Sequence, residues 1–538
     1  MRAEPARMMF KIAGVFNDVR ISKQEWPEIK PSTVKPLTAK LVLARGKSLS
    51  PLRQFLKKSK IAYVVGSWLT WADLLISSCF ATMKSIVPGF LGSDPDGKST
   101  RSLLQSSTML EQAIIAATPF GHLPVLKFGG HELGESFAIN RYLARQFGLA
   151  GNGSLEEAYV DSIADFFKDF FEKTGESVKA IITGGGPIDP AYNEIVAPAR
   201  DAFLPPLERF LKKANSGYVV GNSATWADLI ITEYLATCQS AIPGFLSGYP
   251  SVESYVTWYF PVWIRDCMKR GAFLKYAPNS NGFIMAKVSK QTLCNLRRLC
   301  IGSQSRLYGS PCCSIDDQAV SYRLTYFDLR YLAEGARQIF RHKGVLFEDV
   351  RIRREEWPAL KPKTPFGQLP ILEVDGHVIA QSYAINRYLA RRFGLAGMSL
   401  MEEALVDSVA EAHKEFLEAS LPYFRVLLGV DKGHKQLILR SYKEQQHFQD
   451  DVYRNMIVPA RDKYLPYLER FLAKSESRYL VGKTVTWADF VVSESLATWE
   501  ELAPGFLDGQ PKLKKYTRLV RELPNIAKWI DERPKNIF

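Results

Sequence analysis

The sequence predicts an α/β domain followed by an all-helical domain, complete once near the C-terminus and incomplete twice before it. Strand and helix patterns alternate across residues 322–397, and a helix-rich stretch follows. The motif TWAD occurs three times, starting at Thr70, Thr225 and Thr486, and PGFL follows it each time. TPFG and RYLAR each occur twice, 246 residues apart. Motifs that recur in one order indicate repeated domains.

The complete α/β domain opens with strand and helix signals. Residues 322–327 alternate and are rich in aromatic and β-favouring side chains, which predicts a strand. Residues 333–340 favour a helix, residues 347–352 alternate again, and Trp357-Pro358 ends that pattern. We therefore expect a strand, a helix and a second strand before a loop.

A hairpin and an amphipathic helix complete this domain. Residues 371–380 fold back at Asp375-Gly376, a dipeptide that suits a type I′ turn. Ser382 can cap the helix that follows, whose apolar residues fall on one face. Downstream, Thr486 and Asp489 have the spacing of a capping box, so we interpret all three TWAD motifs as folding signals.

The two earlier copies lack different parts. The first copy begins after the opening strand and passes directly into the end of a helical domain, whereas the second has the hairpin and a full helical domain but no opening strand or first helix. In one interpretation, residues 2–33 and 118–148 share a sheet and residues 34–117 are an insertion; in the other, residues 1–117 are fragments. The expected segments are 1–33 (partial α/β domain), 34–100 (part of a helical domain), 101–150 (second half of an α/β domain), 151–278 (helical domain), 279–320 (linker), 321–398 (complete α/β domain) and 399–538 (helical domain).

Composition narrows the function classes. The 538 residues are 46% hydrophobic and 23% charged, with a net charge of +14. No apolar run approaches the roughly 20 residues needed to cross a bilayer, so we expect no membrane span. The chain carries no nucleic-acid motif, and its densest basic stretch falls in the linker; we expect no nucleic-acid partner.

Seven cysteines in a chain of this length predict no disulfide framework. No Cys/His cluster has the spacing of a zinc site, so we expect no metal. Cysteines without a disulfide framework are typical of a reducing compartment, so we expect a cytoplasmic protein.

Several motifs together resemble one family. They are a Tyr on the first strand, WPALKP, TPFGQLP and a Gln-Ser pair before an amphipathic helix. The segment is similar to the thioredoxin-like domain of sigma-class glutathione transferases of invertebrate type, and residues 399–538 resemble their helical domain. The resemblance implies an enzyme that uses glutathione as co-substrate and conjugates it to hydrophobic electrophiles in detoxification.

The resemblance assigns the catalytic role to Tyr326. A free thiol has a pKa of about 8.5, so little thiolate exists at neutral pH. A phenolic hydroxyl that donates to sulfur in a water-poor site stabilises the thiolate. Tyr322 lies on the same face of the strand and is the competing candidate.

The resemblance also implies a glutathione site around this tyrosine. Pro370 corresponds to a cis-proline that exposes the backbone of Leu369 to the cysteinyl part of the tripeptide. Gln381 and Ser382 precede a helix whose N-terminus favours a carboxylate. Trp357 and Lys361 resemble residues that hold the glycine carboxylate, and Gln368 supports them.

The family supplies an acidic residue from the neighbouring subunit. Asp407 and Glu411 lie four residues apart on the helix that corresponds to it, and a solvated helix face explains them equally well. We expect either a homodimer or a pseudo-dimer within one chain, with the second copy as partner.

The second copy carries a degenerate version of the site at Leu123, Pro124, Glu135 and Ser136. Glu135 replaces the family's Gln and adds a negative charge near a ligand carboxylate, which weakens binding. Since this copy also lacks the catalytic tyrosine, we expect it to be inactive.

One departure affects the function. The family reads RGRAE after the catalytic strand, whereas this chain reads RYLAE, with Tyr331 for Gly and Leu332 for Arg. This change counts against a prostaglandin isomerase. The alternatives to an active transferase are a catalytically weak glutathione-binding or structural relative similar to S-crystallins, a prostaglandin-type sigma enzyme, or a chain that joins neighbouring genes.

Overall fold

The computed structural model of the chain describes residues 118–128, 130–183, 192–258, 320–427, 451, 453–475 and 477–536. Two compact units divide the chain: the first holds residues 1–16, 124–272 and 285–538, and the second holds residues 17–123 and 273–284. The expected segments 1–33 and 34–100, and nearly all of the linker 279–320, lie outside the described residues. Apart from residues 118–123, every described residue belongs to the first unit.

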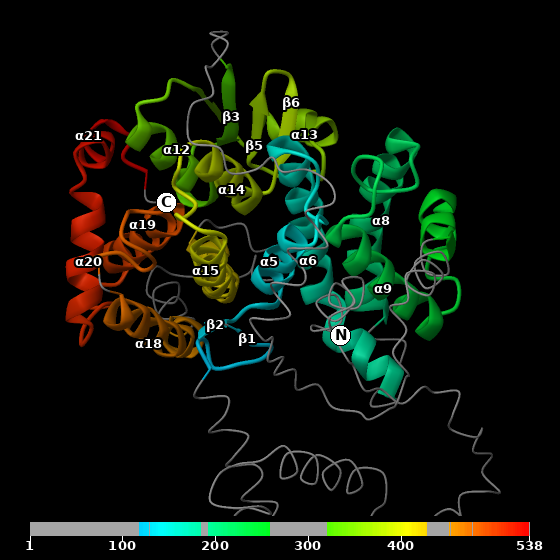
Figure 1. Ribbon diagram of the computed structural model, residues 1–538, viewed down its shortest axis with the longest axis horizontal. Coiled ribbons are helices and arrows are strands. Elements are labelled where there is room, and N and C mark those ends of the chain that lie inside the picture. Colours follow the sequence, from blue (N-terminus) through cyan, green and yellow to red (C-terminus); the bar gives the residue numbers. More distant parts are fainter. Residues whose placement is uncertain are drawn as a thin grey trace, which may run out of the picture. The chain divides into compact units, whose positions relative to one another are not determined.

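The third copy opens with a four-stranded mixed sheet in the order β4-β3-β5-β6 (Figure 1). Strand β3 runs parallel to β4 and antiparallel to β5, and β5 and β6 form the hairpin. The α/β prediction for this copy is therefore confirmed. The elements are β3 (Tyr322–Phe327), α12 (Tyr331–Lys343), β4 (Glu348–Ile352), α13 (Trp357–Leu360), the 3-10 turn η4 (Lys361–Lys363), β5 (Ile371–Val374), β6 (His377–Ala380) and α14 (Ser382–Arg392).

The hairpin turn has the predicted geometry, but the helix after it begins differently. Asp375 and Gly376 both have positive φ, 48° and 83°, as a type I′ turn requires. The expectation that Ser382 caps α14 is wrong, because Ser382 is already the first helical residue and Gln381 occupies the N-cap position. Gln381 has a left-handed φ of 69°, and its carbonyl already accepts the N–H of Ile385 at 2.9 Å. The chain therefore turns into the helix one residue earlier than predicted.

In the second domain of the third copy, the described residues form helices joined by turns. Thr486 caps α19 in a capping box: its N–H donates to Asp489 at 2.8 Å, and its hydroxyl donates at 2.9 Å. The TWAD motif is thus a folding signal here, and Thr225 and Asp228 repeat it in the second copy. The elements of the domain are α15 (Leu400–Leu427), the π-turn η6 (Tyr453–Ile457), α18 (Val458–Lys474), α19 (Trp487–Leu502), α20 (Pro511–Arg521) and α21 (Pro524–Glu532).

The second copy has a short hairpin followed by helices. The hairpin pairs Leu126 with Leu133 and leads into a helix, as in the third copy. The long helix after it packs against the helix that the TWAD motif opens. The elements are β1 (Leu126–Phe128), β2 (His131–Leu133), α5 (Ser136–Gln146), α6 (Ser154–Thr183), η3 (Tyr192–Val196), α8 (Ala197–Ala214) and α9 (Trp226–Ala241).

The second and third copies contact each other through equivalent elements. Helix α6 packs against α14 and β6, and α15 reciprocally packs against α5 and β2. Ser162 Oγ donates to the carbonyl of Ala380 at 2.7 Å, and Ser408 Oγ donates to that of Gly134 at 2.7 Å. Ser408 lies 246 residues after Ser162, and Ala380 lies 246 residues after Gly134. The two hydrogen bonds are therefore equivalent and are related by a local pseudo-two-fold axis.

An aromatic side chain of the third copy also enters the second. Phe366, in the loop before β5, is buried and stacks on Phe166 of α6 with ring centroids 4.3 Å apart. Phe210 of α8 lies 5.3 Å from the same ring. Stacked aromatic rings stabilise a contact beyond the burial of their apolar area. This loop therefore helps to hold the two copies together.

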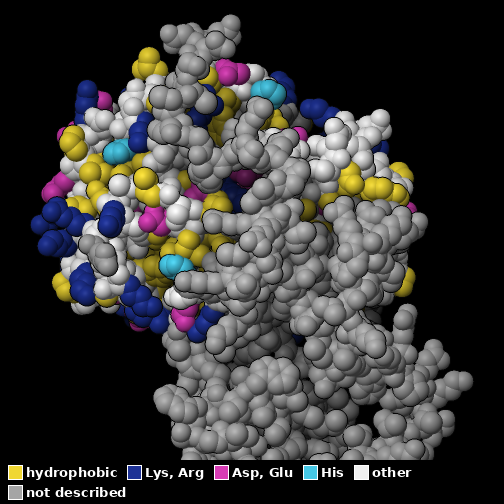
Figure 2. Space-filling model, in the orientation of Figure 1, with side chains coloured by type: hydrophobic (Ala, Val, Ile, Leu, Met, Phe, Trp, Pro, Cys, Tyr) yellow, Lys and Arg dark blue, Asp and Glu magenta, His cyan; other side chains and the backbone are white. Residues whose placement is uncertain are grey.

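Part of the positive charge lies on α20. Figure 2 shows Lys and Arg side chains at the side of the molecule where this helix lies. Its exposed members are Lys512, Lys514, Lys515 and Arg518. Among the described helices, none is both long enough and apolar enough to cross a membrane.

Candidate active site

The sheet register brings the predicted glutathione-site residues to one edge. Thr325 of β3 pairs with Ile371 of β5, and Ile371 pairs with Ala380 of β6. The residues that come next at this edge are Tyr326 after Thr325, Pro370 before Ile371 and Gln381 after Ala380. Residues far apart in sequence thus meet because antiparallel pairing aligns the end of one strand with the start of the next.

Tyr326 is buried at the end of β3, with 4% of its surface exposed. Burial raises the pKa of its hydroxyl well above the ordinary value, although the backbone N–H of Leu332, which bonds to that hydroxyl, lowers it. The phenol therefore keeps its proton at neutral pH. Since its oxygen accepts from Leu332, its hydrogen remains available to a second partner.

Tyr322, the competing tyrosine, lies in the core instead. Its ring contacts Phe340 at 5.1 Å and Phe393 at 6.0 Å. Arg392 lies over its face at 5.8 Å. Although both tyrosines share one face of β3, only Tyr326 lies at the edge with Pro370.

The loop and the helix start at this edge form one polar wall. Gln381 Nε2 donates to Gln368 Oε1 at 2.8 Å. The Leu369–Pro370 peptide bond is cis, as expected from the sequence. Ser382 is buried in the first turn of α14, where backbone N–H groups have no partner within the helix.

Trp357 and Lys361 lie in the loop after β4. Trp357 is half-buried, and its ring contacts Phe327, the residue after Tyr326, at 5.6 Å. Lys361 is exposed, and its stem lies against Gly367: a Cβ at Gly367 would come within 3.4 Å of Lys361 Cε. The structure therefore places both side chains beside the loop that carries Gln368.

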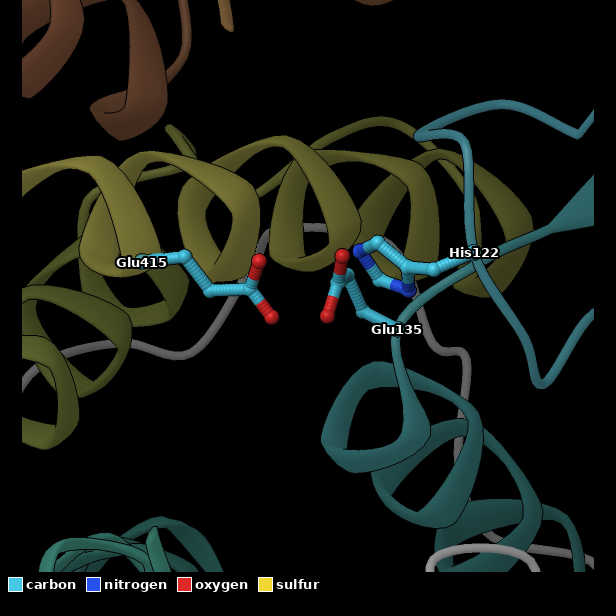
Figure 3. Close-up of side chains that lie close together, drawn as sticks. All are labelled: His122, Glu135 and Glu415. Carbon is cyan, nitrogen blue, oxygen red and sulfur yellow. The ribbon is translucent and has the colours of Figure 1, made fainter. Parts of the chain in front are cut away.

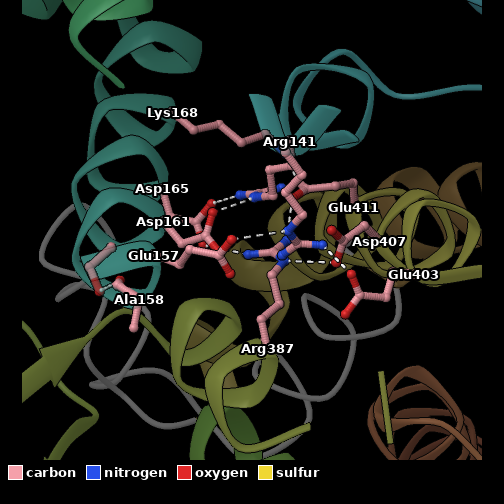
Figure 4. Close-up of polar contacts among 12 residues, drawn as sticks. Arg141, Glu157, Ala158, Asp161, Asp165, Lys168, Arg387, Glu403, Asp407 and Glu411 are labelled. Carbon is pink, nitrogen blue, oxygen red and sulfur yellow. Dashed lines mark hydrogen bonds and ion pairs between the residues drawn. The ribbon is translucent and has the colours of Figure 1, made fainter. Parts of the chain in front are cut away.

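The two predicted cross-subunit acids lie in a buried ion-pair network (Figure 4). Asp407 accepts from Arg387 Nε at 2.8 Å. Glu411 accepts from Arg387 and from Arg141 of the second copy, each at 2.6 Å, and from Lys168 at 2.7 Å. Both acids belong to α15, which packs on the second copy, so they do not face the edge that carries Tyr326.

Acidic side chains of the second copy bond to helix α14, which begins at the candidate site of the third copy. Asp165 accepts from Arg387 of α14 at 3.0 Å, and Asp161 from Arg391 at 3.4 Å. The sequence reasoning missed both acids. The 246-residue repeat step could have found them, because it maps Asp407 and Glu411 onto Asp161 and Asp165.

Burial and charge act in opposite directions in this network. Burial by itself raises the pKa of Glu411, but Lys168, Arg141 and Arg387 hold that pKa well below its ordinary value. Burial raises the pKa of Glu157 to about 7 and that of Glu403 to about 6. Positions 157 and 403 are also equivalent, so the pseudo-symmetric pair of carboxyl groups shares the same direction of pKa shift.

The second copy reproduces the backbone of the site with a different side chain. Glu135 precedes α5 with φ 65° and ψ 116°, nearly the values of Gln381, and Ser136 opens the helix. Figure 3 shows the Glu135 carboxylate pointing toward Glu415 of α15, and their oxygens lie within 4.8 Å (His122, also drawn, belongs to the other compact unit). Pro124 and Leu123 are half-buried. The carboxylates of Glu135 and Glu415 thus lie close together, and the third copy has the amide of Gln381 at the position of Glu135.

A cavity of about 580 Å³ adjoins the loop that holds Lys361 and Gln368. Asp169, Lys173 and Arg209 of the second copy line its other side. The walls of this cavity therefore come from both copies.

Comparison with known proteins identifies the family of these domains. The family described as glutathione S-transferase, N-terminal domain matches residues 322–391, and the family described as glutathione S-transferase, C-terminal domain matches residues 191–258 and 431–533. Glutathione S-transferase 1 of Ascaris suum is 60% identical over 217 residues, which are 40% of this chain and 98% of that protein. Probable glutathione S-transferase 7 of Caenorhabditis elegans is 41% identical over 219 residues, 41% of this chain and 100% of that protein. The solved glutathione S-transferase of Ascaris lumbricoides is 58% identical, and the match covers 40% of this chain and 100% of that one with a TM-score of 0.37.

The fold and the site define a thioredoxin-like domain followed by a helical domain, as in an enzyme that binds glutathione. The chain belongs to the glutathione S-transferase family.

Proposed function

We propose that the third copy conjugates the thiolate of glutathione to electrophilic small molecules, as a sigma-class detoxification enzyme of the cytoplasm. One observation carries this proposal: the buried Tyr326 hydroxyl accepts from the Leu332 N–H and lies at the same sheet edge as Pro370 and Gln381. An incoming thiol would meet a phenol that still holds its proton. Its O–H can donate a hydrogen bond to the sulfur as negative charge develops there.

The reaction balances without another reagent. The glutathione thiol gives its proton to solvent, and the sulfur forms a bond to the electrophilic carbon. In a substitution, the leaving group departs with its bonding electrons; in an addition to a conjugated carbonyl, a proton returns to the α-carbon. The protein stabilises the thiolate and orients the tripeptide.

The tripeptide would be held by the residues around that edge. The Leu369 backbone would pair with its cysteinyl part, the N-terminus of α14 at Gln381 and Ser382 would take the γ-glutamyl carboxylate, and Lys361 with Trp357 would take the glycine carboxylate. Asp165 of the second copy, which contacts Arg387, replaces Asp407 and Glu411 as the cross-copy acid of this site.

We assign the second copy the role of a tethered, inactive partner. The reciprocal contacts of α5, α6, α14 and α15 support this role, since they bury the surface through which a second chain would pair. One chain would then contain a pseudo-dimer with one active site.

The test is the rate of glutathione conjugation to a generic aromatic electrophile for the full chain, Tyr326→Phe and Tyr322→Phe. We expect Tyr326→Phe to lower the rate by about tenfold or more, because the variant loses the donor to sulfur. Tyr322→Phe is the matched control and should keep the rate, since Tyr322 packs in the core. No rate above background from a folded chain would leave a glutathione-binding or structural relative.

A further inference from the structure

A cavity of about 580 Å³ lies between the third copy's loop before β5 and helices α6 and α8 of the second copy. Its third-copy wall includes Lys361 and Gln368, which the proposed function places at the glycine end of the tripeptide. Small-molecule sites have volumes of roughly 300–1,000 Å³, so this cavity has room for a further part of a ligand. The cavity therefore adjoins the glutathione site at the end where the tripeptide stops.

Three cations and one acid are among the residues that line this cavity. Lys173 of α6 and Arg209 of α8 come from the second copy, and Lys361 comes from the third. All three are exposed, and neither lysine has an ion-pair partner among the described residues. The acid, Asp169, already accepts from Lys414 at 3.0 Å. The cavity therefore favours an anionic group.

The loop before β5 is held against the second copy. Phe366 stacks on Phe166 of α6 with ring centroids 4.3 Å apart. The Arg209 guanidinium donates to the carbonyl of Pro365 at 3.3 Å. Because these contacts join one wall of the cavity to the other, the cavity is formed before a ligand enters, and a preformed site binds with a smaller loss of conformational freedom.

The repeat shows which of these cations belongs to the second copy alone. The step of 246 residues that relates α6 to α15 maps Lys173 onto Ala419, and the TWAD step of 261 residues maps Arg209 onto Arg470. A symmetric pair of third copies would therefore have alanine at the position of Lys173. Lys173 is thus a cation that the second copy adds to this cavity.

We propose that the third copy's site also accepts thiol peptides longer than glutathione, in which an acidic residue follows the glycine. The γ-glutamyl-cysteinyl part stays at the edge with Tyr326, and the added residue lies in the cavity, where Lys173, Arg209 and Lys361 attract its carboxylates. The reaction is the same as with glutathione: the sulfur bonds to the electrophilic carbon, and the thiol proton goes to solvent.

This inference rests on the proposed transferase function and names a further class of thiol substrate for the same site. Lys173 is the specificity-determining residue, because it is the cation by which this cavity differs from that of a symmetric pair of third copies.

The first experiment measures binding without catalysis. Two S-methylated tetrapeptides, γ-glutamyl-cysteinyl-glycyl-glutamate and its glutamine counterpart, have nearly the same shape and differ by one negative charge. Isothermal titration calorimetry of the full chain should give a Kd about fivefold lower for the glutamate peptide, as expected for a charge pair in an exposed site. At about 1 M salt the two Kd values should converge, because the charges are screened.

Two substitutions at Lys173 assign the effect to that side chain. Lys173→Ala should lower the ratio of the two Kd values to about two or less, because part of the positive charge is lost. Lys173→Glu should abolish or reverse the preference, because a carboxylate then faces the glutamate peptide. Lys179→Ala is the matched control: Lys179 is an exposed lysine of the same helix that does not line the cavity, so the parent ratio should remain.

The second experiment uses the unmethylated tetrapeptides as co-substrates with a generic aromatic electrophile. We expect KM for the glutamate peptide to be about fivefold lower than that for the glutamine peptide, and this difference to shrink in Lys173→Ala. The two peptides should have similar kcat values, because the thiol and Tyr326 are the same in both reactions.

The outcomes separate the two proposals. Conjugation of glutathione together with equal Kd values for the two tetrapeptides, or with no binding of either, would overturn this inference and leave the transferase function intact. A charge preference that persists in both Lys173 variants would also overturn it. Preferential binding of the glutamate peptide by a folded chain that conjugates no thiol would overturn the transferase function, and with it the claim that the longer peptide is a substrate.

Discussion

Arg141 and Arg387 occupy equivalent positions in the two described copies, and both donate to Glu411 at 2.6 Å. Each also bonds the acid twenty residues after itself, Asp161 and Asp407 respectively. All of these side chains are almost fully buried. A buried charge without its partner is costly, so the network makes each copy depend on the other.

Glu411→Ala tests that dependence. The substitution leaves the charges of Arg141, Arg387 and Lys168 without their shared acceptor, so we expect it to lower the free energy of unfolding by about 3–5 kcal/mol. Urea denaturation of the full chain measures the change.

Glu176→Ala provides the control for this prediction. Glu176 lies on α6 in an exposed pair with Lys179 at 3.2 Å, and its loss should cost less than about 0.5 kcal/mol. Equal effects of the two variants would show that the buried network contributes no more than a surface pair.

Gln381→Glu gives the third copy's candidate site the carboxylate that Glu135 has at the equivalent position of the second copy. We expect KM for glutathione to rise by about tenfold or more, because the new carboxylate repels the γ-glutamyl carboxylate at the start of α14. The reciprocal variant, Glu135→Gln, should leave KM unchanged, since the proposed active site has its own Gln381. A similar change of KM in both variants would mean that the second copy takes part in glutathione binding.

The contact between copies should weaken as pH rises. Burial raises the pKa of Glu157 to about 7, and burial together with Glu172 raises that of Glu418 to about 8 despite the opposing charges of Lys414 and Lys168. Between the ordinary value of 4.5 and these values, the folded chain holds more protons than the unfolded chain, so stability is fully present at the acid end and falls as pH rises.

Thermal midpoints at about pH 5 and about pH 8 measure this effect, and the second should be lower. Glu418→Gln mimics the protonated carboxyl and should reduce the fall. Glu411, whose pKa is lowered, loses its contribution only below the ordinary value and does not offset the trend. A midpoint that rises over this interval would contradict the prediction.

The two capping boxes allow a comparison of the copies. Thr486→Ala removes a hydroxyl bonded to Asp489 at 2.9 Å, and Thr225→Ala removes the equivalent bond to Asp228 at 2.7 Å. Each substitution should lower the free energy of unfolding by about 1 kcal/mol. If the copies unfold together, both variants shift a single transition. Two transitions, each moved by one variant, would show that the copies unfold independently.

The sequence by itself determined the local elements and the family. Alternation predicted β3, Asp375-Gly376 predicted the hairpin, and TWAD predicted the caps, because strand period, turn geometry and capping depend on residues close together in the chain. The same local rule misplaced the start of α14, since the left-handed backbone of Gln381 is fixed by the hairpin and helix that it joins.

Only the tertiary structure decided which tyrosine lies at the candidate site and which acids cross between copies. Tyr322 and Tyr326 have the same phase along β3, and the packing of Phe340 and Phe393 on Tyr322 separates them. Asp165 reaches Arg387 across 222 residues of sequence because α6 packs on α14. Such contacts depend on how folded elements pack, which no local pattern encodes.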